Sequence, residues 1–166
     1  MGKPQNDQNI LMKNFFKNKL CLVITTLFGT GYLPLIPGTS ACFLSLILFF
    51  LIKSDFYFFL LTLFSFYLSF SLTTKAEKIF KEKDCKKIVI DDFFGMLVAL
   101  LFLPRQIRWA FLSFFLFRLF DLLKIPPANK LERFEGAKGI VGDDLVAGVY
   151  TNIVLQIVRL LLKISS

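Results

Sequence analysis

The stretch Gly139–Gly148, GIVGDDLVAG, sets the interpretation of the whole chain. Two adjacent acids, Asp143 and Asp144, stand at the start of a segment that has no charge from residue 145 to residue 158. A carboxylate near the hydrocarbon of a membrane is costly unless it finds a partner, and such residues are commonly functional. Small residues follow the pair and allow another helix to approach closely. We therefore interpret this stretch as a functional site at the end of a membrane-spanning helix.

The composition indicates a small integral membrane protein. Of its 166 residues, 55% are hydrophobic and 22 are Phe, which is too apolar for a soluble domain of this size. The net charge of +8 suits membrane phospholipids with anionic headgroups as partners. The lysines form no basic domain, so nucleic acid is not an expected partner. The chain has no histidine, which excludes catalysis and metal binding by that residue. Its three cysteines have the spacing of neither a disulfide framework nor a metal motif.

Uncharged segments predict an all-α fold, a polytopic integral membrane helical bundle with four to five spans. The expected spans are residues 20–52, 56–74, 88–104, 109–123 and 143–164. Within the first of these, GTGYLPLIPGTS (Gly29–Ser40) contains three glycines and two prolines, which end helices and favour turns. We therefore expect a re-entrant loop here, covered by protein or lining a watery cavity. Residues 1–19 are predicted to be a basic interfacial segment, and residues 20–166 a single transmembrane catalytic domain.

The distribution of Lys and Arg predicts the orientation. The N-terminus and the loops 75–87 and 124–142 are basic, whereas the turns 53–55 and 105–108 are short. Cytoplasmic loops carry the excess of positive charge in membrane proteins. With the basic loops in the cytoplasm, the acid pairs and the Gly/Pro loop all lie at the cytoplasmic face.

Clustered carboxylates without His or Cys partners favour a hard divalent cation, and we expect Mg²⁺. A pair of adjacent acids occurs twice, at Asp91–Asp92 and at Asp143–Asp144. A further acid, Asp121, lies one helical turn from Arg118. The candidate catalytic residues are Asp91, Asp92, Asp121, Asp143 and Asp144. The predicted metal ligands among them are Asp91, Asp92, Asp143 and Asp144.

A phosphate group would find cationic side chains and, in the glycine-rich loops, backbone N–H groups. The predicted substrate-binding residues are Gly29, Thr30, Gly31, Gly38, Thr39, Arg118, Lys124 and Lys138. Each of these features could also serve only to stabilise the fold, and the sequence leaves that alternative open. An acid pair can cap a helix start, and Arg118 with Asp121 can form an intramembrane ion pair.

Four motifs in order, GTGYLPLIPGT, IVIDDFFGM, FRLFDLLK and GIVGDDLVAG, resemble the phosphatidylglycerophosphatase A family from about Leu20 onward. The resemblance implies a Mg²⁺-dependent enzyme of the bacterial cytoplasmic (inner) membrane that converts phosphatidylglycerophosphate to phosphatidylglycerol and inorganic phosphate. The positions that carry it are Gly29, Gly31, Pro34, Pro37, Gly38, Thr39, Asp91, Asp92, Gly95, Arg118, Asp121, Lys124, Gly139, Asp143, Asp144, Ala147 and Gly148. Three places depart from the family pattern. Asp92 replaces a common Glu, Ala41–Cys42 replaces Gly-Ser, and Ile125–Pro126 replaces Pro-Trp.

Other classes of protein fit the residues less well. A Cys-x5-Arg phosphatase would need an arginine where Asp91 follows Cys85. The alternative outside the enzymes is a carboxylate-lined divalent-cation transporter or channel. Such a protein should carry acids near the middle of its spans, whereas here they gather at one end beside cations. The sequence predicts no particular oligomeric state.

Overall fold

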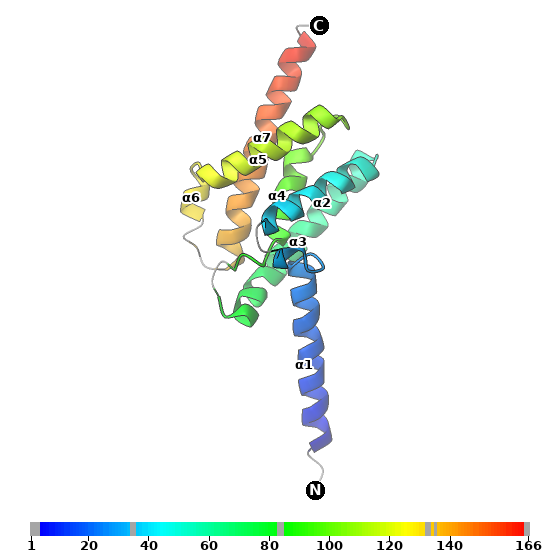
Figure 1. The fold of residues 1–166 in the computed structure, drawn as a ribbon, viewed down its shortest axis with the longest axis vertical. Helices are drawn as coiled ribbons and strands as arrows, with labels where there is room; N and C mark the ends of the chain where they lie inside the picture. The colour runs from blue at the N-terminus through cyan, green and yellow to red at the C-terminus, as the bar shows by residue number, and fades with distance from the viewer. Residues whose placement is uncertain (1–3, 34–35, 83–84, 132–133, 135, 165–166) are drawn as a thin grey trace.

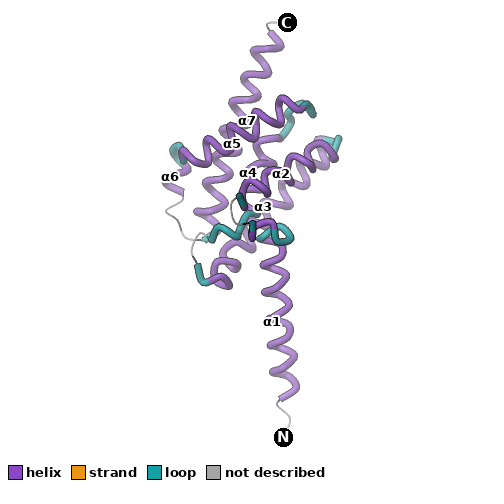
Figure 2. Tube along the Cα trace, in the orientation of Figure 1, coloured by secondary structure: helices purple, strands orange, loops and turns teal. Residues whose placement is uncertain are grey.

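The chain folds into a helical bundle. The computed structural model describes residues 4–33, 36–82, 85–131, 134 and 136–164, and this part of the chain contains helices and loops but no strand (Figure 2). The predicted all-α class is therefore confirmed. The helices are α1 (Pro4–Thr25), the 3₁₀ helix η1 (Thr30–Tyr32), α2 (Pro37–Leu51), α3 (Asp55–Phe80), α4 (Ile90–Leu100), α5 (Ile107–Leu123), α6 (Ala128–Leu131) and α7 (Ala137–Ile164).

The short helix α4 lies at the centre of the bundle and contacts α2, α3, α5 and α7. Every residue of α4 except Asp92 is buried. A helix that is apolar on all sides belongs in a core, where neighbours cover each face. With 11 residues α4 is about 16 Å long, against about 30 Å of hydrocarbon. The helix inside the predicted span 88–104 is thus too short to cross a membrane unaided.

Two glycines bring α4 and α7 into backbone contact. A Cβ atom on Gly148 would collide with the carbonyl oxygen of Gly95, and one on Gly95 would lie 2.8 Å from the carbonyl oxygen of Asp144. Both obstacles are backbone atoms, which cannot move aside as a side chain could. This crossing therefore requires glycine on each helix.

Polar side chains of α7 satisfy the carbonyl groups at the end of α4. Asn152 donates from Nδ2 to the oxygens of Ala99 (3.1 Å) and Leu101 (2.8 Å). Gln156 donates to Leu101 (3.3 Å), and Arg159 donates to the oxygen of Phe102 (2.9 Å). The last carbonyls of a helix have no partner within it, so these bonds allow α4 to end inside the protein.

Arg105 holds the C-terminal end of α2 and the N-terminal end of α3 together. Its Nη2 donates to Asp55 Oδ1 at 2.8 Å, and its guanidinium lies 4.3 Å and 4.8 Å from the ring centroids of Phe49 and Phe58. Burial lowers the pKa of Arg105, and the neighbouring Asp55 opposes that shift. Stacking on two rings compensates for hydration lost on burial.

The loop predicted over Gly29–Ser40 is shorter than expected. Gly29 adopts a left-handed conformation (φ 96°), η1 follows it, and α2 begins at Pro37. Proline suits the first position of a helix because its fixed φ is helical and its missing N–H is not needed there. Pro34 lies outside the described residues. The sequence thus placed the turn correctly but not the start of the helix.

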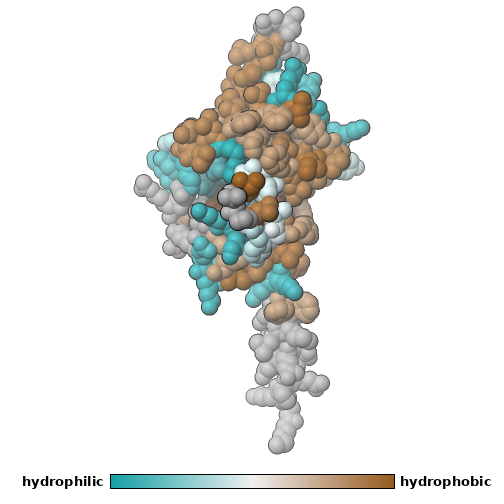
Figure 3. All heavy atoms as spheres, in the orientation of Figure 1, coloured by the Kyte–Doolittle hydropathy of each residue, from teal (hydrophilic) through white to brown (hydrophobic). Residues whose placement is uncertain are grey.

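Two of the described helices, α3 and α7, are long and apolar enough to cross a membrane. Helix α1 runs through the boundary predicted at residues 19 and 20 and projects from the bundle, so that the two termini lie at opposite ends (Figure 1). Large apolar side chains are exposed on the outer faces, and hydrophobic surface covers much of the upper body in Figure 3. Examples are Phe56, Tyr57, Phe64, Phe111, Phe115 and Leu161.

The helix crossing yields a stability prediction. Gly148→Ala should lower the free energy of unfolding by about 1–3 kcal/mol, because its methyl group meets backbone at Gly95. The matched control in the same helix is Gly142→Ala, whose Cβ would approach only the Leu131 side chain, at 3.4 Å. Thermal unfolding in detergent measures both. Equal unfolding temperatures would mean that the helices separate freely at this point.

Candidate functional site

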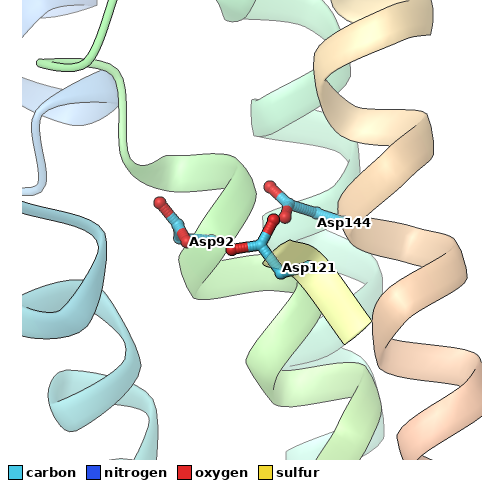
Figure 4. Close-up of side chains that lie close together, drawn as sticks. All are labelled: Asp92, Asp121 and Asp144. Carbon is cyan, nitrogen blue, oxygen red and sulfur yellow. The ribbon is translucent and has the colours of Figure 1, made fainter. Parts of the chain in front are cut away.

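Three helices each direct one carboxylate to a common point. Asp92 comes from the first turn of α4, Asp121 from the last turn of α5, and Asp144 from the N-terminal part of α7 (Figure 4). One carboxylate oxygen from each lies within 4.8 Å of those from the other two. These residues are 23 or more positions apart in the chain, so only the fold brings them together.

The three acids line a pocket of about 270 Å³. All five candidate catalytic residues line it, together with four of the predicted substrate-binding residues, Gly38, Thr39, Arg118 and Lys124. The remaining lining residues are Ile36, Pro37, Cys85, Lys86, Ile88 and Ile140. Three of the four sequence motifs therefore contribute acids or cations to one cavity, and the Gly/Pro motif contributes backbone.

Arg118 bridges two of the converging acids. Its Nη1 donates to Asp92 Oδ1 and to Asp121 Oδ2, the second at 3.0 Å. Lys124, at the C-terminal end of α5, donates from Nζ to Asp143 Oδ2 at 3.3 Å. The cations offset part of the repulsion between carboxylates held so close together. They also lie where an anionic substrate group would meet them.

Asp91 and Asp144 are nearly inaccessible, with 6% and 5% of their surface exposed. Asp91 Oδ1 is buried and has no hydrogen-bond partner among the described residues. Burying an acceptor without a partner is unfavourable by about 1–3 kcal/mol, and by more for a charged group. A buried, unsatisfied carboxylate oxygen beside four further acids fits a pocket built for a cation or a transferable proton.

The first turn of α2 forms another wall of the pocket. Pro37, Gly38 and Thr39 line it, and the first N–H groups of a helix have no partner within the helix. A Cβ atom on Gly38 would collide with the carboxylate of Asp92. Glycine at this position therefore allows the start of α2 to approach the acid, and it places donor groups suited to phosphate at the pocket.

Four residues predicted to bind substrate do not line this pocket. Gly29 forms the turn before η1, Thr30 Oγ1 donates to the oxygen of Thr26 at 3.1 Å, and Gly31 packs against the carbonyl of Lys87. Lys138 lines a separate groove of about 380 Å³ that also contacts α3. The glycines thus shape the loop, and Lys138 lies on another face of α7.

Sequence reasoning did not identify Lys86 as part of the pocket. It is one of several lysines in the basic segment predicted over residues 75–87, and nothing in that run distinguishes it from its neighbours. The structure places Lys86 at the pocket with its side chain exposed.

Cys85 lines the pocket but is unsuited to nucleophilic attack. The residue is buried, and burial raises the pKa of its thiol above the usual range. The thiolate is the reactive form of cysteine, so a raised pKa leaves this residue largely unreactive at neutral pH. The chemistry of the pocket belongs to its carboxylates.

Comparison with known proteins identifies the family of the chain. The family model described as Phosphatidylglycerophosphatase A matches residues 23–159. Proteins named Phosphatidylglycerophosphatase A from Haemophilus influenzae and Escherichia coli are 33% and 30% identical, covering 77% and 74% of this chain and 82% and 73% of their own lengths. A protein of Bacteroides thetaiotaomicron with the provisional name phosphatidylinositol-3-phosphatase is 34% identical over 84% of this chain and 94% of its own. No solved structure matches the chain.

The family match and the relatives named for this activity show that the protein is an enzyme, a phosphatase that acts on phosphoric monoesters, and a pocket lined by acids and cations suits that activity. The chain belongs to the phosphatidylglycerophosphatase A family. The transporter or channel considered as the alternative is therefore set aside.

Gly38 provides a test of the pocket geometry. Gly38→Ala should lower phosphatase activity on the order of 100-fold, because its methyl group would displace the Asp92 carboxylate, and a small misplacement of a reacting group can have an effect of this size. Phosphate release and the unfolding temperature should be measured together, with Gly142→Ala as the control. Normal activity in Gly38→Ala would show that the position of Asp92 is unimportant.

Proposed function

We propose that this protein hydrolyses phosphatidylglycerophosphate to phosphatidylglycerol and inorganic phosphate at the cytoplasmic face of a bacterial inner membrane, and that the reaction depends on Mg²⁺. The observation that carries the proposal is the convergence of Asp92, Asp121 and Asp144 beside two cationic side chains and the start of α2. A phosphate monoester carries two negative charges, so its pocket must supply positive charge as well as acids.

The donor set supports a magnesium site. Carboxylate oxygens are the protein ligands that Mg²⁺ prefers, and it usually binds one or two of them together with water and substrate phosphate oxygens. We assign Asp92, Asp121 and Asp144 as the residues that would hold the ion, on the basis of their mutual distances. The sequence prediction named Asp91 and Asp143 in place of Asp121. Bound Mg²⁺ would supply Lewis-acid stabilisation of charge on the phosphoryl group.

The remaining residues of the pocket have separate roles in the proposal. Arg118 and Lys124 bind phosphate oxygens, and the N–H groups at the start of α2 orient the same group. Water attacks phosphorus, the bond between phosphorus and the glycerol oxygen breaks, and that oxygen takes a proton from solvent water to leave as the hydroxyl group of phosphatidylglycerol. Asp91 accepts the proton of the attacking water, a role consistent with its unsatisfied and buried Oδ1.

The directions of the helices support the proposed orientation. The pocket contains the N-terminal ends of α2, α4 and α7 and the C-terminal end of α5, so one end of the bundle carries the whole site. The same end carries Lys75 and Lys78 near the C-terminus of α3, and the short turns at 52–54 and 101–106 lie at the other ends of these helices. We propose that α3 and α7 cross the membrane fully. Helices α2 and α5, about 22 Å and 25 Å long, complete their crossings with adjoining residues. Helix α4 and the residues that adjoin it connect the two faces at the centre, so the chain passes between the faces five times.

A pair of introduced cysteines tests the orientation. Lys86→Cys should react with a membrane-impermeant thiol reagent only after the cytoplasmic face is opened, whereas Ser54→Cys should react in intact cells. Both positions are exposed and lie at opposite ends of α3, and the native cysteines are buried. Labelling of Lys86→Cys from outside would reverse the proposed orientation.

The function itself is tested by phosphate release from purified protein. We expect release from phosphatidylglycerophosphate with Mg²⁺ and loss of release when the ion is chelated. Asp92→Asn, Asp121→Asn and Asp144→Asn should each lower the rate on the order of 100-fold, since Asn keeps the shape of Asp and removes its charge. Phosphatidylinositol 3-phosphate should be assayed in parallel, because one relative carries a name for that activity.

The matched control is Asp55→Asn. Asp55 is an exposed residue that does not line the pocket, and an asparagine in its place can still accept a hydrogen bond from Arg105. Its activity should remain near that of the unmodified protein. Full activity in all three pocket variants, at normal protein levels, would refute the carboxylate site.

A further inference from the structure

Another concave surface lies between α1 and α3, away from the acids. This groove has a volume of about 550 Å³, roughly twice that of the catalytic pocket, and shares no lining residue with it. The two helices run in opposite directions here, as Figure 1 shows. They touch where Cys21 Sγ donates to the oxygen of Leu72 at 3.7 Å. The groove therefore extends from this contact along both helices.

Three lysines border the groove, and no acid lines it within the described part of the chain. Lys17 of α1 and Lys75 and Lys78 of α3 all line it, and all three are exposed. Glu77 neighbours Lys78 in the chain but is not among the lining residues, and it has an interaction of its own. Three positive charges on one rim repel one another unless an anion lies between them. The groove is thus complementary to a negatively charged group.

The floor of the same groove is apolar. Leu20 and Ile24 of α1 face Leu72 and Ile79 of α3 across it. The aliphatic part of a lysine side chain can cover apolar surface while its ammonium group stays in a polar environment. One groove can therefore have both a basic rim and an apolar floor. An occupant must accordingly have an anionic group joined to a long apolar part.

We propose that this groove binds an intact anionic phospholipid of the surrounding membrane, with its phosphate on Lys17, Lys75 and Lys78 and an acyl chain along the apolar floor. Basic pockets between helices at the cytoplasmic side of a membrane are suited to anionic headgroups. Lys17 lies in α1, and Lys75 and Lys78 lie near the C-terminal end of α3, in the two basic segments that we assign to the cytoplasmic side. The lipid would fasten α1, which otherwise projects from the bundle, to α3.

This site is separate from catalysis. None of the five pocket carboxylates lines the groove, so a phospholipid there is bound and not hydrolysed. The inference requires that the protein lies in a membrane, as proposed above, but not that it is a phosphatase. Lipid binding and phosphate release are therefore measured on the same preparations, and either can fail alone.

Native mass spectrometry of the full chain in neutral detergent tests the site, with phosphatidylglycerol and phosphatidylcholine as probes. The triple variant Lys17→Gln, Lys75→Gln, Lys78→Gln should retain phosphatidylglycerol on the order of 100-fold less well, from about five-fold for each lysine near an anionic headgroup. The control Lys53→Gln, Lys81→Gln, Lys130→Gln loses the same charge at exposed positions that line neither the groove nor the catalytic pocket. It should retain the lipid as the unmodified chain does.

A second variant tests the apolar floor without changing charge. Leu72→Trp fills the groove beside Cys21 and should also reduce phosphatidylglycerol retention, while phosphatidylcholine binding stays weak throughout. Equal retention of phosphatidylglycerol by the groove variant and its charge-matched control would overturn the proposal. A change in oligomeric mass confined to the groove variant would overturn it too, because a second protein chain would then be the occupant.

Discussion

The contact between the backbones of α4 and α7 is the constraint on which the site depends. Gly95 lies one turn after Asp92 on α4, and Gly148 lies one turn after Asp144 on α7. When the two glycines meet, the two acids are held on the same side of the crossing, at the end where each helix begins. A larger residue at either glycine would separate the helices and the carboxylates together. Packing and chemistry are thus set by the same few positions.

Electrostatic repulsion is the second constraint. Five carboxylates in a pocket of about 270 Å³ would oppose folding if nothing offset their charge. Arg118 contacts acids from α4 and α5, and Lys124 contacts an acid of α7. These cations tie three helices together through the site. A phosphatase can use the same groups, because those that stabilise the acids without substrate are also those that attract a phosphate.

Much of this arrangement could be read from the chain. The all-α class followed from the length and composition of the apolar segments, and membership of the family followed from four motifs in order. The convergence of the acids at one end followed from combining the positive-inside rule with their positions in the segments. These inferences use properties that are local in sequence, such as periodicity, charge and glycine content.

What the sequence could not provide depends on contacts between distant segments. Gly31 packs against the backbone of Lys87, and this contact, which keeps Gly31 away from the pocket lining, cannot be seen in the sequence. Asn152 and Gln156 gave no signal, since an amide in an apolar helix has no visible partner until α4 ends beside it. The start of α2 could have been predicted from the sequence, because proline, here Pro37, is typical of the first turn of a helix.

The shortness of α4 has an electrostatic consequence. Peptide dipoles add along a helix to about half a positive charge at its N-terminal end and half a negative charge at its C-terminal end. Helices α2 and α4 begin at the pocket, and the negative end of α4 is neutralised by amide and guanidinium groups of α7. Two positive poles therefore lie beside the carboxylates, and the negative end of α5 lies at the same pocket. The attraction for an anion resides partly in the direction of the main chain, where no side-chain substitution can remove it.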